Sequence, residues 1–143
     1  MKIVPKNPEI QKEKEELNLQ HKLKITEEEA WVICKQLLEA LNYLNSQGIV
    51  HRDIKPANIL LKDKNSLDDI RLADFGLSEA LPTFEGHKLK KNFSSKCGTI
   101  LYMAPEYFTK DSFTNAVDIW ALGIILFKML SEDLTHPFYY ENS

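Results

Sequence analysis

One short stretch, residues 51–58, constrains this chain more than any other part of it. It reads His-Arg-Asp-Ile-Lys-Pro-Ala-Asn and lies between an apolar helical pattern and an apolar run typical of a strand. Within it, Asp53 can accept a proton or orient a hydroxyl, Lys55 can neutralise a phosphoryl oxygen, and Asn58 can hold a hard cation. The stretch therefore predicts a reactive polar loop between two apolar elements.

The helix before this loop is predicted by its cap and by its period. Thr26 and Glu29 fit a capping box, in which each side chain accepts a hydrogen bond from the other's backbone N–H. Apolar residues then recur at spacings of three and four, at Ala30, Ile33, Leu37, Leu41 and Leu44. Because Gly48 can end the helix, the sequence predicts an amphipathic helix from Glu27 to about Gln47.

Two short apolar runs after the loop predict a β-hairpin. They cover residues 59–61 and 70–73, with polar turn chemistry at residues 62–66 between them. Pairing of the runs would bring Asn58, just before the first strand, close to Asp74, just after the second. The hairpin therefore predicts that two oxygen ligands, distant in the sequence, converge on one point.

The remaining patterns are weaker. Residues 1–23 are rich in charge and predict a solvated lead-in segment. Residues 77–103 have no sustained period and predict a long loop, a kind that is often functional. Thr114 is the candidate cap of a final apolar helix from Ala116 to Leu130.

Composition excludes several classes of function. The chain has 143 residues, 43% of them apolar, which suits one packed domain, and its net charge of −3 gives no basic field for nucleic acid. Cys34 and Cys97 are too few for a zinc site or a disulfide framework and suit a reducing compartment. The apolar segment Val117 to Leu130 contains Asp118 and Lys128 and is too short to span a membrane, so we expect a soluble, cytoplasmic chain.

Further motifs follow the loop in a fixed order. They are Asp-Phe-Gly at 74–76, Cys-Gly-Thr at 97–99, Ala-Pro-Glu at 104–106, and Asp-x-Trp-x-x-Gly at 118–123. Together with the loop at 51–58, this series resembles the C-terminal lobe of a eukaryotic-type serine/threonine protein kinase. The resemblance extends from about Lys24 to Phe138. A hydrolase with His51 as general base is the weaker interpretation, since the sequence has no Gly-x-Ser-x-Gly nucleophile elbow.

The resemblance implies an α+β fold, mainly α-helical, with a small β-hairpin around the catalytic loop. Residues 24–143 would form a partial kinase domain, a C-lobe truncated after its central helix, with the N-lobe missing. Neither a glycine-rich Gly-x-Gly-x-x-Gly loop nor a strand lysine in a Val-Ala-x-Lys setting is found in the sequence. One apolar face of the final helix would then be exposed.

The resemblance also implies catalytic roles for three residues. Asp53 would lie near the substrate hydroxyl, Lys55 would contact the transferred phosphate, and Thr99 would bridge Asp53 and Lys55. A lysine at that offset is similar to the serine/threonine class rather than the tyrosine class. The implied substrates are Ser/Thr hydroxyls of proteins, and Ile100, which directly follows Thr99, leaves the substrate preference open.

The implied cofactors are ATP and Mg²⁺. Lys55, Asn58 and Asp74 would bind the nucleotide phosphates, with Asn58 and Asp74 as the metal ligands. Leu60 matches the position that packs beneath the adenine ring.

A regulatory pair and a set of supporting residues complete the resemblance. Arg52 would pair with a phosphate on Ser95, placed there by an upstream kinase, although Ser94 competes and both serines could be solvated loop residues. Glu79 stands where some kinases have a second cation. Asp118 would accept hydrogen bonds from the backbone around His51 and Arg52. The supporting residues implied are His51, Phe75, Gly76, Glu106, Asp118 and Trp120.

Three functions follow from this sequence. The first is transfer of the ATP γ-phosphate to protein Ser/Thr hydroxyls, weak or absent in the partial chain alone. The alternative is a catalytically silent kinase fragment that acts as an interaction module. An unrelated helical adaptor would require every motif above to be accidental.

Overall fold

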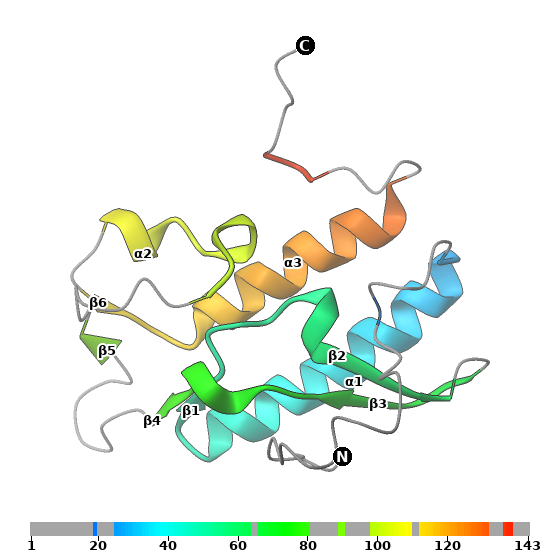
Figure 1. The fold of residues 1–143 in the computed structure, drawn as a ribbon, viewed down its shortest axis with the longest axis horizontal. Coiled ribbons are helices and arrows are strands. Elements are labelled where there is room, and N and C mark those ends of the chain that lie inside the picture. The colour runs from blue at the N-terminus through cyan, green and yellow to red at the C-terminus, as the bar shows by residue number, and fades with distance from the viewer. Residues whose placement is uncertain are drawn as a thin grey trace.

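The computed structural model describes residue 19 and residues 25–63, 66–80, 89–90, 98–109, 112–131 and 136–138. These parts combine helices with small antiparallel sheets of two strands each (Figure 1). The helices are α1 (Glu27–Ser46), α2 (Glu106–Thr109) and α3 (Ala116–Leu130). The strand pairs are β1 (Ile49–Val50) with β4 (Glu79–Ala80), β2 (Ile59–Asp63) with β3 (Ser66–Leu72), and β5 (Leu89–Lys90) with β6 (Ser112–Phe113).

Helix α1 begins at the predicted capping box. The Thr26 hydroxyl accepts the Glu29 N–H at 3.2 Å, and the Glu29 carboxylate accepts the Thr26 N–H at 2.9 Å. The helix ends at Ser46, one residue before the predicted end, because Gln47 is already the cap. Gly48 then takes a positive φ of 66°, which glycine adopts without steric cost.

The predictions for the other elements need small corrections. Strand β2 extends to Asp63, into the predicted turn, and β3 begins at Ser66. The segment 77–103, predicted as loop throughout, contributes β4 and β5, which are too short to leave a period in the sequence. The cap of α3 is Asn115 rather than Thr114, although the Thr114 hydroxyl still accepts the Ala116 N–H at 3.2 Å.

The main core lies where α1, α3 and the β2–β3 hairpin meet. Figure 1 shows the hairpin lying over α1, with α3 packed along the same helix. The residues buried there from α1 include all those of the predicted apolar face. Ile33, Ile59 and Ile125 are fully buried, so each of the three elements contributes a side chain that has no contact with water. No helix of the described parts is long and apolar enough to cross a membrane.

Helix α3 has one buried face and one exposed apolar face. Val117, Ile125 and Met129 face the core. Ile119, Phe127 and Leu130 lie on the opposite side, each about half exposed (49%, 49% and 52%). The exposed apolar face expected from the sequence is therefore present in the structure.

A buried carboxylate connects α3 to the polar loop after β1. One Asp118 oxygen accepts the His51 N–H at 2.8 Å, and the other accepts the Arg52 N–H at 2.9 Å. These two bonds hold Arg52 at a φ of 68°, a left-handed conformation that is uncommon for a residue with a side chain. Burial raises the pKa of Asp118 to about 6, while the two hydrogen bonds oppose that rise.

The two faces of α3 should respond differently to truncation. Ile125→Ala removes a fully buried side chain and is expected to lower the free energy of unfolding by about 2–5 kcal/mol. Phe127→Ala, on the exposed face, should cost about 1 kcal/mol or less. Urea unfolding of both variants tests this; equal losses of stability would contradict the assignment of the two faces.

Asp118 should make stability depend on pH in a definite direction. Its pKa is higher in the folded chain than its ordinary value of 3.8, so the protonated form favours folding. That contribution is complete below about pH 4 and is lost as pH rises through about 6. We expect the unfolding free energy of the wild type, relative to Asp118→Asn, to fall by about 2–3 kcal/mol over this range. Urea titrations of both proteins at several pH values measure the difference, and a pH-independent difference would contradict it.

Candidate active site

The polar loop and the hairpin place two of the predicted ligands at the same end of the fold. Strands β2 and β3 pair with Ile59 opposite Leu72. The Ala73 N–H then donates to the Asn58 carbonyl at 2.9 Å, which extends the ladder by one step. Asp74 follows directly, at a φ of 62°, and its carboxylate accepts the Gly76 N–H at 3.4 Å. Pairing of the strands therefore brings Asn58 and Asp74 to one end of the hairpin, as expected.

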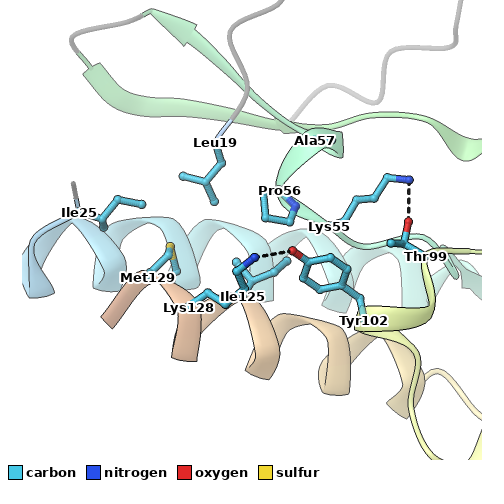
Figure 2. A pocket seen from close by; sticks show the side chains of 10 residues that line it. All are labelled: Leu19, Ile25, Lys55, Pro56, Ala57, Thr99, Tyr102, Ile125, Lys128 and Met129. Atoms are coloured by element: carbon cyan, nitrogen blue, oxygen red, sulfur yellow. Dashed lines mark hydrogen bonds between the residues drawn. The ribbon is translucent and has the colours of Figure 1, made fainter. Parts of the chain in front are cut away.

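Asp53 is the centre of the side-chain network. It is buried, and the Asn58 side chain donates to its carbonyl at 2.8 Å and to its carboxylate at 3.0 Å. Lys55 lies 2.8 Å from the same carboxylate oxygen. The Thr99 hydroxyl donates to the other oxygen at 3.3 Å. It also accepts from the Lys55 ammonium at 3.0 Å, a bond drawn in Figure 2. Thr99 thus bridges Asp53 and Lys55 and fixes the orientation of the carboxylate.

A close approach of two backbones makes the Thr99 contact possible. Gly98 has a φ of 104°, and a Cβ at this position would lie 2.8 Å from the Arg52 carbonyl oxygen. Only glycine fits both the conformation and the space. Gly98 was not among the site residues proposed from the sequence, although the Cys-Gly-Thr motif contained the signal.

His51 is a buried packing residue in this geometry. It is fully buried, its Nδ1 accepts the Asp53 N–H at 3.3 Å, and its Nε2 lies 3.0 Å from the Ala73 carbonyl oxygen. Its ring meets the Phe75 ring edge-on at 4.7 Å. Burial lowers the pKa of His51. Both ring nitrogens are therefore engaged by backbone groups. Neither nitrogen is available to accept a proton from a substrate, which argues against His51 as a general base.

Arg52 already has an internal partner. Its guanidinium forms an ion pair with Glu79 of β4 at 2.6 Å and donates to the Leu77 carbonyl at 2.6 Å. The sequence indicated that Glu79 replaces a cation but did not predict this pair. Ser94, Ser95 and Cys97 lie outside the residues that the structure describes.

Three other predicted residues have different surroundings in the described part of the chain. Leu60 is half-buried on β2. Glu106 opens α2, and within the described segments it forms no ion pair. Trp120 stacks on Phe138 at 5.6 Å.

The residues at this end fit a hard cation bound together with phosphates. The Asn58 amide nitrogen is committed to Asp53, so its amide oxygen faces away from that carboxylate. Among the described residues, no group of three or more His, Cys, Asp or Glu side chains is placed to hold a metal alone. A magnesium ion at this end would therefore need further oxygen ligands besides those of Asn58 and Asp74. The phosphates of a bound nucleotide can supply such oxygens.

Comparison with known proteins identifies the family. A family model described as "Protein kinase domain" matches residues 8–143. Serine/threonine-protein kinase atg1 of Dictyostelium discoideum is 42% identical over 107 residues, which cover 75% of this chain and 15% of that protein. Calcium/calmodulin-dependent protein kinase type 1 of Macrobrachium nipponense is 38% identical over 117 residues, covering 82% of this chain and 31% of that protein.

A third relative agrees with these two. Calcium/calmodulin-dependent protein kinase cmkB of Emericella nidulans is 42% identical over 104 residues, covering 73% of this chain and 25% of that protein. The chain therefore spans less than a third of the length of each of these relatives. Because the family match covers nearly all of its residues, the chain belongs to the protein kinase family, as part of a domain of the eukaryotic serine/threonine type.

Proposed function

We propose that this chain carries the catalytic loop of an enzyme that transfers the ATP γ-phosphate to Ser/Thr hydroxyls of protein substrates. The observation that supports this most is the network on Asp53, whose carboxylate is oriented by Asn58, Lys55 and Thr99. A carboxylate fixed in this way can accept the proton of a hydroxyl or align it for attack, and a lysine beside it can balance charge on a phosphoryl group. Protein kinases generally work with ATP and Mg²⁺.

Within this proposal each residue has a separate task. Asp53 orients the substrate hydroxyl, while Lys55, held by Thr99, contacts the transferred phosphate. Asn58 and Asp74 hold magnesium, which when bound neutralises charge on the nucleotide phosphates. Leu60, on β2, contacts the adenine.

We further propose that residues 24–143 are the C-lobe part of the domain, with α3 as its central helix, and that residues 1–23 are a lead-in segment. The parts that cover the adenine and grip the phosphates in the resembled kinases come from the N-lobe. On this basis the isolated chain transfers phosphate slowly or not at all.

The proposed regulation involves Arg52 and Ser95. An upstream kinase would phosphorylate Ser95, and the Arg52 guanidinium would bind the phosphate. Because Glu79 already neutralises Arg52 at 2.6 Å, a phosphate must displace this carboxylate or share the guanidinium with it.

Substitution of the two carboxylates should separate their tasks. Asp53→Asn is expected to reduce Mg·ATP-dependent phosphorylation of a generic protein substrate by about 10²–10⁴-fold, without weakening Mn²⁺·ATP binding. Asp74→Asn should weaken that binding as well. Radiolabelled ATP measures transfer, and paramagnetic broadening of NMR signals by Mn²⁺ measures binding without any need for turnover.

Asp63→Asn, at the exposed end of β2, is the matched control and should resemble the wild type in both measurements. Unchanged Mn²⁺·ATP binding in Asp74→Asn would refute the proposed metal site. Transfer that is equal in the wild type and in Asp53→Asn would refute the proposed role of Asp53, whereas Mn²⁺·ATP binding tests the metal site even if the isolated chain transfers too slowly to detect.

Removal of the internal carboxylate should increase the effect of phosphorylation. Glu79→Gln frees the Arg52 guanidinium, so phosphorylation of Ser95 should stimulate the variant roughly five- to tenfold more than the wild type. The ratio of activities before and after treatment with an activating kinase measures this. An equal ratio in both proteins would argue against the proposed switch. So would a ratio that stays the same in both proteins when Ser95 is replaced by alanine.

A further inference from the structure

A cavity of about 390 Å³ opens beside the proposed catalytic loop (Figure 2). The Lys55 and Thr99 side chains lie at one end of it, and Ile25 and Met129 lie at the other. Lys55 and Thr99 both line the cavity and both contact Asp53. A substrate polypeptide that presents a hydroxyl to the Asp53 carboxylate must therefore place a neighbouring residue at the mouth of the cavity.

The walls of the cavity are largely apolar. Leu19 and Pro56 lie on one side of it, and Ile125 of α3 lies on the other (Figure 2). This space is large enough to take an amino-acid side chain, and its apolar surface would pack against a methylene stem.

Among the described residues that line the cavity, both of the charged ones are lysines. Lys128, from α3, lies midway along the wall, and its ammonium donates to the Tyr102 hydroxyl at 3.2 Å. It also lies 5.6 Å from the centre of the Tyr102 ring. Tyr102 holds the ammonium in place but does not neutralise it, and among the residues that the structure describes no carboxylate lines the cavity.

We infer that this cavity selects substrates: it receives the side chain of a glutamate or aspartate close to the phosphorylated serine or threonine, and Lys128 binds that carboxylate. This inference rests on the proposed function and adds a substrate class to it. An arginine or lysine in the same place would face the Lys128 ammonium, with no carboxylate beside it among the described residues of the lining, so basic substrates are rejected.

Peptide binding without nucleotide tests the selection separately from catalysis. The probes are fluorescent peptides that contain one serine. In each set, a single position before or after the serine is occupied by glutamate, leucine or arginine, and the sets together cover every such position. At one position, glutamate should bind roughly three- to fivefold more tightly than leucine, and arginine more weakly, as measured by fluorescence anisotropy. The net charge of −3 would by itself favour arginine peptides, so a glutamate preference must arise locally.

Variants of Lys128 should change this preference in steps. Lys128→Met keeps the apolar stem and should abolish the preference for glutamate while leucine peptides still bind. Lys128→Glu should reverse the preference towards arginine. Lys62→Met is the matched control, because Lys62 lies on β2 with 64% of its side chain exposed and does not line the cavity; it should behave as the wild type.

The outcomes distinguish this inference from the proposed function. A glutamate preference that survives in Lys128→Met, that disappears equally in Lys62→Met, or that is absent at every position overturns it. A preference that depends on Lys128, in a chain whose phosphoryl transfer is unaffected by Asp53→Asn, would support the inference and refute the proposed catalytic role. Circular dichroism of each variant confirms that the fold is retained.

Discussion

The geometry of the site depends on one buried acid. Asp118 lies on the long helix α3, and both of its oxygens accept backbone N–H groups of the polar loop. Without these bonds the loop would lose the support for the left-handed turn at Arg52 and with it the direction of Asp53. A carboxylate in this position has a desolvation cost, and its two hydrogen bonds fix a short, irregular segment to the helix.

The loop supported in this way contains charges that are balanced locally. Asp53 is matched by Lys55, and Arg52 is matched by Glu79. The two pairs differ in exposure, since the Asp53 side chain is 7% exposed and that of Glu79 is 39% exposed. The first pair is therefore held firmly, while solvent weakens the second. This difference suits the roles proposed above, in which Asp53 stays fixed and Arg52 changes partners.

Local patterns in the sequence were sufficient to predict much of this fold. The capping box and the apolar period predicted α1 to within one residue, and the limits of α3 agree with those expected. The strands β4 and β5 were missed because two residues cannot establish a period. The resemblance implied the bridge from Thr99 to Asp53 and Lys55, but that contact depends on Gly98, whose need for space appears only when two distant backbones come together. The hydrogen bonds from Asn58 to Asp53 were not predicted. The Arg52–Glu79 pair likewise depends on the β1–β4 pairing, which no local pattern predicts.

Asn58 holds the site together from both of its ends. Its side chain donates to Asp53, and its backbone carbonyl accepts from Ala73, the residue before Asp74. Rotation about this one residue would break a hydrogen bond to the loop and another to the hairpin end at once. The loop and the hairpin end should therefore open together, so that hydrogen exchange would report one opening event for the two segments.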